Sequence, residues 1–217
     1  MCIRDSIKDI VVWNKFITGL ALIKNILIYP LTRNIVHKWN SLIPIDKWRK
    51  LYWDRAKHLN IIGGLDLHVK VVYQERTHGL LIPSYKAGFK WLINKVYSKQ
   101  PIRTKQEILK ALEDGNLYLS INQNFINIYG EDEEGIKILG ESLKSGGKIN
   151  IKSLKKAVNI IYHNCVPILK TDTSEFSFKV DKEGDYHLEV YEYDFKIFNL
   201  YFGFRPVVIT NKFKVIN

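Results

Sequence analysis

The last stretch of the chain, from residue 175 onward, alternates apolar and polar side chains in four short runs. A period of two places successive side chains on opposite faces of a strand, so each run predicts a half-buried strand. The connections between the runs are too short for the crossover that parallel neighbours need, which favours antiparallel pairing. This region therefore predicts a β-meander with strands at 176–180, 186–190, 195–204 and 207–215.

Two further strand patterns precede the meander. The residues Leu65–Val71 alternate cleanly after a pair of glycines and predict a half-buried strand. The runs 117–121 and 125–129 flank a polar loop at 122–124, as the two strands of a β-hairpin do. We therefore expect these two strands to pair with each other.

Helices are expected where capping residues precede apolar positions three and four residues apart. Thr104 and Glu107 form a capping box, and Gly115 follows the apolar stripe, which predicts a helix over 104–114. Similar patterns predict three more helices: one from Pro83 through Val96, one from Asp132 to Gly146 and one from Asn150 to Cys165. The expected fold class is thus α+β, with a helical basic N-terminal part, a mixed middle and a C-terminal antiparallel β-meander.

Residues 7–31 predict an apolar helix with a narrow polar strip, ended at Pro30. Lys15 and Lys24 interrupt the apolar run, so it lacks the stretch of about 18 uncharged residues that a spanning helix needs. We expect either a helix that packs on the core or an amphipathic helix that lies in a membrane interface. A truncated transmembrane helix is the third alternative.

The first six residues, 1–6, resemble the translation of a sequencing adapter, so we treat them as a non-native prefix. The rest divides into a basic, Trp-rich helical segment, 7–60, and an α+β domain, 61–217, with one continuous domain as the alternative. Without Cys2, Cys165 is the only native cysteine. An intramolecular disulfide is then excluded, which fits an intracellular, reducing location.

Positive charge is concentrated in the first half of the chain. The whole sequence has 33 Lys and Arg against 22 Asp and Glu, a formal net charge of +11. Residues 1–108 hold 19 basic and 7 acidic side chains, whereas residues 109–217 hold 14 and 15. The abundance of Ile, Lys and Asn suggests an AT-rich genome, but uniform codon drift does not explain this segregation.

The segment 33–57 interleaves basic side chains with tryptophans, and Asp46 is a possible N-cap for a helix near 47–58. Such a surface binds phosphates electrostatically and stacks on bases, or it lies on anionic lipid. The alternative without a ligand is a solvated basic face whose Trp rings belong to the core. The first hypothesis is a non-catalytic binding protein for a polyanion, nucleic acid being the expected one, through Arg33, Lys38, Lys47, Trp48, Arg49, Lys50, Trp53, Arg55 and Lys57. The second is a peripheral membrane protein anchored through 7–31.

An enzyme with dispersed active-site residues is the third hypothesis. Asp66 and His68 share the polar face of the strand expected at 65–71 and form half of a site at most. The chain has no Walker A, GxGxxG, GxSxG, HExxH, EF-hand or CxxC pattern, so we expect neither a cofactor nor a metal site.

Three other groups of reactive side chains favour structural roles. His163 and Cys165 would point apart on the helix expected there, which argues against a nucleophilic pair. The acidic run 131–134 is typical of a helix start. His187 and Glu189 are expected on a solvated strand face, where cross-strand pairing is favoured over a ligand or base-stacking surface.

Overall fold

The structure is a computed structural model of the chain, and it describes residues 23, 60–64, 91–121, 123–198, 200–202 and 205–217. The helices expected within 7–31 and 47–58 and the strand expected at 65–71 lie outside the described residues, apart from Ile23, which is helical. The elements in order are β1 (Leu92–Val96), α4 (Lys105–Glu113), β2 (Leu117–Ile121), β3 (Ile126–Asp132), β4 (Gly135–Lys137), β5 (Ser142–Lys144), β6 (Lys148–His163), β7 (Val166–Lys179), β8 (Gly184–Glu192), β9 (Phe195–Ile197), β10 (Leu200–Phe202), β11 (Arg205–Thr210) and β12 (Phe213–Ile216).

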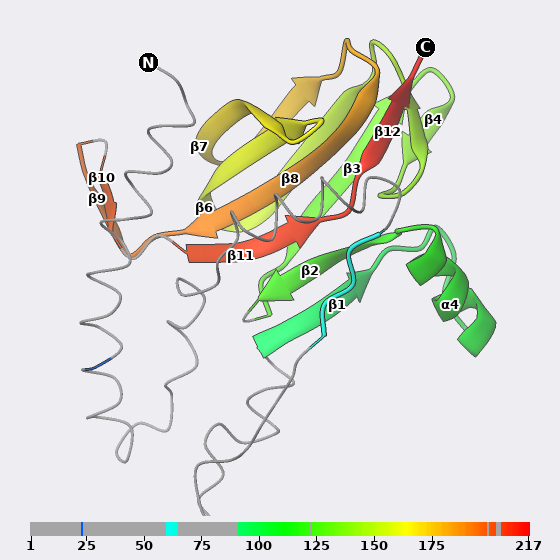
Figure 1. Cartoon of the computed structure of the whole chain (residues 1–217), viewed down its shortest axis with the longest axis horizontal. Helices are drawn as coiled ribbons and strands as arrows, with labels where there is room; N and C mark the ends of the chain where they lie inside the picture. Colours follow the sequence, from blue (N-terminus) through cyan, green and yellow to red (C-terminus); the bar gives the residue numbers. More distant parts are fainter. Residues whose placement is uncertain (1–22, 24–59, 65–90, 122, 199, 203–204) are drawn as a thin grey trace, which may run out of the picture.

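Most described residues belong to one strongly curled sheet that forms a half-barrel (Figure 1). The strand order is β1-β2-β11-β8-β6-β3-β4, with β7 on the other side of β6 and β12 beside β8. The pair β12–β5 is parallel, and every other described pair is antiparallel. The strands β9 and β10 form a separate two-stranded ribbon, called the β9–β10 ribbon below.

The long strand β6 produces the curl. Its first part, up to Ser153, pairs with β3, and its last part, from Val158, pairs with β8 along the same edge. Along the opposite edge it pairs with β7, with a register shift between Lys152 and Ala157. An irregularity of this kind bends a strand and increases its twist. One strand therefore joins both parts of the half-barrel.

The α+β prediction is wrong, because the described part of the chain is mostly β with one complete helix. The helix expected at 150–165 is β6 with the turn that follows it, the helix expected at 132–146 contains β4 and β5, and residues 92–96 form β1. The reason is clearest in β6, where Ala157–Tyr162 are all buried. A run that is apolar on both faces contains helical spacings by chance, so periodicity alone does not separate strand from helix.

Predictions that rest on a local capping or turn signal agree better with the structure. The helix α4 begins at the predicted capping box, with both reciprocal Thr104–Glu107 hydrogen bonds present. Gly115 follows its end at φ +76°, a conformation that favours glycine. The strands expected at 117–121 and 186–190 are present as β2 and β8, and 176–180 overlaps the end of β7. The single strand expected at 195–204 is instead the pair β9 and β10, and the one expected at 207–215 is divided into β11 and β12. The pairing also differs from the prediction. β2 pairs with β1 and β11 rather than β3, and β7 pairs with β6 rather than β8.

The main core fills the concave side of the half-barrel with Ile, Leu, Val and aromatic side chains from β2, β3, β6, β8, β11 and β12. A second, smaller cluster lies on the opposite face of β6 and includes Val158, Ile160 and Tyr162. The central strands are consequently buried on both faces. This explains why alternation, which depends on one solvated face, is weak in β6, and why the polar residues that alternate in β8 are buried rather than solvated.

The short segment 60–64 is fastened to the sheet by two asparagine side chains. Asn211 accepts from the backbone N–H of Ile61 at 2.7 Å and donates to its carbonyl at 3.1 Å. Asn94 makes the same two-way contact with Gly63, at 2.8 and 2.9 Å. These residues therefore belong to the body of the β domain although they lie far from Asn211 in sequence.

Candidate functional site: a lysine–tyrosine cluster around Asp172

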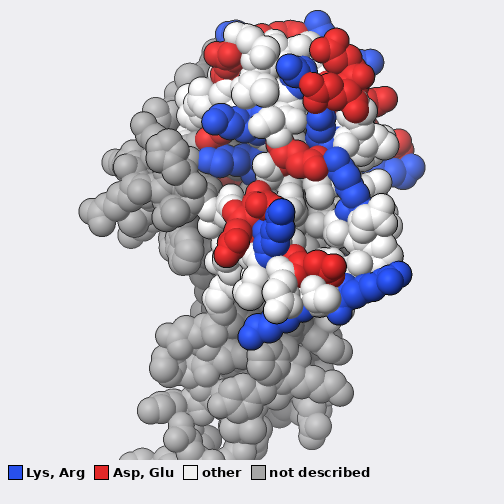
Figure 2. Space-filling model, turned by 90° about the vertical axis from the view of Figure 1, so that its right-hand side faces the viewer, with Lys and Arg blue, Asp and Glu red and all other residues white. Residues whose placement is uncertain are grey.

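The nine residues expected to bind a polyanion, from Arg33 to Lys57, lie outside the described residues, as do Asp66 and His68. Their predicted roles stay predictions. Residues 91–217 hold 18 Lys and Arg against 16 Asp and Glu, so most of the +11 charge belongs to residues 1–90. Figure 2 shows acidic and basic side chains interspersed over one described face of the domain.

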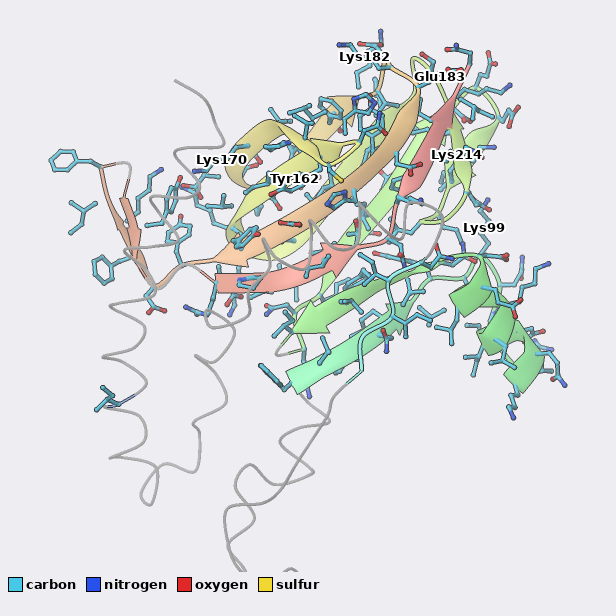
Figure 3. All side chains as sticks on the ribbon, viewed as in Figure 1. Lys99, Tyr162, Lys170, Lys182, Glu183 and Lys214 are labelled. Carbon is cyan, nitrogen blue, oxygen red and sulfur yellow. The ribbon has the colours of Figure 1, made fainter. Side chains whose placement is uncertain are left out.

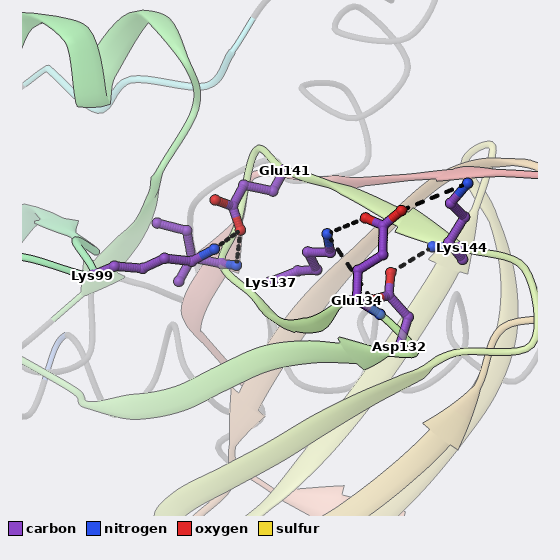
Figure 4. Close-up of polar contacts among 7 residues, drawn as sticks. Lys99, Asp132, Glu134, Lys137, Glu141 and Lys144 are labelled. Atoms are coloured by element: carbon purple, nitrogen blue, oxygen red, sulfur yellow. Dashed lines mark hydrogen bonds and ion pairs between the residues drawn. The ribbon is translucent and has the colours of Figure 1, made fainter.

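The acidic run 131–134 lies at a β-turn rather than at the helix start expected there. Asp132 accepts hydrogen bonds from the backbone N–H groups of Glu134 and Lys144, each at 2.9 Å (Figure 4). Lys137 forms an ion pair with Glu134 at 2.7 Å. Burial raises the pKa of Asp132, but the two N–H donors and Lys137 outweigh it and hold the pKa below its ordinary value. This group closes the β3–β4 turn.

Asn164 and Cys165 form the two-residue turn between β6 and β7, and His163 is the last residue of β6, so none of the three lies in a helix. Asn164 and Cys165 both have positive φ, +46° and +70°, as a type I′ hairpin turn requires. The His163 ring stacks on Tyr186, with 4.6 Å between centroids, and its Nε2 lies 2.8 Å from the Glu183 carbonyl. The geometry assigns these residues to the hairpin.

The expectation of a solvated face for His187 and Glu189 is wrong, because both side chains are buried. Tyr191 donates a 2.6 Å hydrogen bond to Glu189 Oε2, and His187 Nε2 lies 3.6 Å from Glu189 Oε1. The His187 ring also stacks on Tyr162 at 4.7 Å. A cavity at this level, inside the half-barrel, measures about 10 Å³, close to the lower limit for one water. That cavity is lined mostly by side chains of the main core and has no room for a substrate.

A different group of polar side chains gathers at the end of the sheet that bears the β9–β10 ribbon. Its centre is the Asp172 carboxylate on β7, whose Oδ2 lies 3.0 Å from Lys196 Nζ and 3.9 Å from Lys156 Nζ. Tyr193 donates to Asp172 Oδ1 at 2.9 Å, and Tyr201 donates to Oδ2 at 3.4 Å. We call these residues, together with Lys170, the Asp172 cluster.

Four parts of the fold bring the Asp172 cluster together. Lys170 and Asp172 are two residues apart on β7 and so face the same side (Figure 3 labels Lys170). Lys156 lies at the irregular part of β6, where β7 pairing is interrupted. Lys196 and Tyr201 are directly paired across the β9–β10 ribbon. Tyr193 follows β8 and packs edge-on against Tyr201, with 4.9 Å between ring centroids.

The Tyr201 ring lies between the cluster's charges. Lys170 Nζ is 4.8 Å and Lys196 Nζ 4.7 Å from its centroid, within the range of cation–π attraction. Hydrogen bonds to Tyr201 and Asp172 raise the pKa of Lys196 above its ordinary value. Burial lowers the pKa of Lys170, and the neighbouring Lys196 ammonium lowers it further.

Lys170 is therefore the least compensated cation of the cluster. Among the described residues, no carboxylate lies within ion-pair distance of Lys170, whereas Lys156 and Lys196 share Asp172. The three lysines and one aspartate leave an excess of positive charge beside two tyrosine rings. Burial and the Lys196 ammonium both disfavour the charged form of Lys170. An anion bound near Lys170 would favour that charged form again.

The comparisons with known proteins return nothing. No family model, curated protein or solved structure matches the chain. The function is consequently inferred from the chain's own side chains, and the Asp172 cluster is the described group in which lysines outnumber the carboxylate that they share.

Two properties of the described residues bear on the kind of site. No group of three or more His, Cys, Asp and Glu side chains there is arranged to hold a metal ion. No helix within the described ranges has both the length and the apolar character needed to cross a bilayer.

The Asp172 cluster was missed at the level of sequence. The sequence places Lys170 and Asp172 after a predicted helix and Lys196 on a predicted meander strand, so it gives no reason to expect them together. The available signal was the Lys-Thr-Asp alternation at 170–172, which puts two charges on one face if the segment is a strand. The partner on β9 follows only from the folded ribbon.

Proposed function

We propose that the protein is a non-catalytic polyanion-binding protein and that Lys156, Lys170 and Lys196 bind phosphate groups of the polyanion. The observation that carries this proposal is that two ammonium groups, Lys156 and Lys196, share the single Asp172 carboxylate while a third, Lys170, lies beside them on the Tyr201 ring. Lysine binds phosphate as a point charge, so it needs neither the planar geometry nor the fixed spacing of arginine. The excess charge of the cluster provides the attraction.

The tyrosines of the cluster support the same function. Tyr193 and Tyr201 donate to Asp172 and thereby hold the carboxylate in place between the lysines. Their rings also provide an apolar wall that lowers the local dielectric and strengthens the attraction between lysine and phosphate. The cluster is thus ordered before a ligand arrives, which reduces the entropy lost on binding.

The basic segment 33–57 belongs to this proposal as a second contact region, with nucleic acid as the ligand expected for it. It supports the proposal by its charge, because residues 33–57 hold 7 Lys and Arg against 2 Asp and Glu. Such a segment steers a polyanion toward the domain before the short-range contacts of the Asp172 cluster form. A location on an intracellular, membrane-peripheral surface is part of the same proposal.

The test is the affinity of the full chain for a fluorescently labelled single-stranded oligonucleotide, measured by anisotropy at low salt. Replacing Lys156, Lys170 and Lys196 together by Gln should weaken binding about tenfold or more, because three phosphate contacts are lost. The matched control is the triple variant Lys105→Gln, Lys182→Gln, Lys214→Gln, which removes the same charge from exposed lysines outside the cluster.

Both triple variants should unfold at the Tm of the natural sequence, which shows that any loss of binding is not a loss of folding. Equal affinities of the two triple variants would contradict a role of the Asp172 cluster. Absence of binding by the natural sequence at low salt would contradict polyanion binding altogether.

A further inference from the structure

The tip of the β9–β10 ribbon exposes large apolar side chains. Phe198 is 92% exposed, and Ile197 and Phe195 are each about half exposed. Figure 1 shows the ribbon beyond one end of the main sheet, between the end of β8 and the start of β11. Isolated exposed apolar residues are ordinary, but adjacent ones on a projecting hairpin are typical of an interaction surface.

The backbone at Phe198 adds an independent observation. Its φ is +51°, in the left-handed region that favours Gly, Asn and Asp, and its ring packs against little of the protein. A Gly or Asn at this turn would be less strained and better solvated. Folding therefore gives no reason for an aromatic residue here, and backbone strain of this kind is concentrated at functional sites.

The charges at the base of the ribbon complement an anionic surface. Lys196 lies on the ribbon itself, and the other lysines of the Asp172 cluster adjoin it. Beside the ribbon, Arg205 lies 2.8 Å from Asp194 and 3.4 Å from Glu192 and offsets one of these two negative charges. The ribbon thus has apolar side chains at its tip and lysines at its base. A membrane surface has the matching order, with phosphates on the outside and acyl chains deeper in.

We infer that the β9–β10 ribbon docks the protein on an anionic membrane, with Ile197 and Phe198 inserted among the acyl chains and the Asp172 cluster on the headgroup phosphates. This inference rests on the proposed function and specifies the source of its phosphates as lipid. Nucleic acid uses the lysines equally well, and its bases stack on aromatic rings, but it offers no apolar layer that takes up Ile197 together with Phe198. Lysine alkyl stems also suit this position, because they reach along apolar surface while the ammonium stays in water.

The test compares binding of the full chain to two kinds of vesicle by flotation. One kind contains phosphatidylcholine mixed with phosphatidylserine, and the other contains phosphatidylcholine alone. We expect the natural sequence to float with the anionic vesicles only. The double variant Ile197→Ser/Phe198→Ser should bind anionic vesicles about tenfold more weakly or worse, because two apolar side chains no longer leave water.

The matched control is Ile108→Ser/Ile136→Ser, which makes the same kind of change at two exposed apolar residues on α4 and β4. It should float as the natural sequence does. The oligonucleotide affinity, measured in parallel at the same salt concentration, should be the same for both double variants and the natural sequence.

The outcomes separate the two proposals. A ribbon variant that floats as well as the control overturns the inference, and so does a natural sequence that binds the oligonucleotide but no vesicles. In both cases polyanion binding stands. A ribbon variant that loses oligonucleotide binding as strongly as vesicle binding also overturns it, because the tip would then serve nucleic acid or the fold. A natural sequence that binds neither probe overturns the proposed function and the inference with it.

Discussion

Lys196 and Asp172 form a 3.0 Å ion pair that joins the β9–β10 ribbon to the edge strand β7. The ribbon is a separate sheet with no ladder hydrogen bonds to the half-barrel among the described residues. Side chains therefore fix its position, and the Asp172 carboxylate is the point at which two lysines and two tyrosines meet. Asp172 holds the cluster together, yet it also cancels part of the charge that a polyanion would contact.

Removing that single carboxylate should therefore strengthen polyanion binding. Asp172→Asn keeps the shape of the side chain and one oxygen acceptor but removes the negative charge near three ammonium groups. We expect the oligonucleotide affinity to rise roughly threefold at low salt, from the loss of one repulsive charge at short range. Asp181→Asn, at an exposed surface pair with Lys179, is the control and should change the affinity little. A lower affinity for Asp172→Asn would mean that the carboxylate matters more for placing the lysines than for opposing the ligand.

The stability of the domain should depend on pH through Asp132. Its folded pKa is held below the ordinary 3.8 by backbone N–H donors and Lys137 that outweigh burial. A depressed pKa in the folded state stabilises the protein above pH 3.8, and this stabilisation is lost as the pH falls through the folded pKa.

Asp132→Asn should lower the free energy of unfolding by about 1–2 kcal/mol at neutral pH, because a neutral amide oxygen is the weaker acceptor. The difference between the variant and the natural sequence should shrink below pH 3.8, where the natural carboxyl is itself neutralised. Urea unfolding at several pH values measures it. A difference that stays constant across the pH range would show that shape rather than charge is lost.

Asn211 should hold the segment 60–64 to the domain. Asn211→Ala removes both hydrogen bonds to Ile61 and leaves two backbone groups without these partners. We expect a loss of about 2 kcal/mol in the free energy of unfolding and faster proteolysis near residues 60–64. Asn127→Ala, at an exposed position on β3, should have little effect on either measurement. Unchanged proteolysis in Asn211→Ala would place the attachment of the segment elsewhere.

The sequence predicted what local chemistry determines. The Thr104–Glu107 capping box and Gly115 delimit α4 within a few residues, so that helix was found. Ala157–Tyr162 were assigned to a helix because they are buried on both faces, and only their pairing with β7 and β8 distinguishes them. The Asp172 cluster could not be predicted from the sequence for the same reason. Lys170 and Lys196 come together only through the pairing of β6 with β7 and the fold of the ribbon.

The salt dependence of oligonucleotide binding tests the central claim most directly, because it counts the phosphate contacts that the lysines make. The slope of log affinity against log salt concentration should be shallower by about two in the variant Lys156→Gln/Lys170→Gln/Lys196→Gln, since each lost contact with a single strand contributes about 0.7. The control Lys105→Gln/Lys182→Gln/Lys214→Gln should keep the slope of the natural sequence. Equal slopes for all three proteins would contradict the claim that the Asp172 cluster binds phosphate.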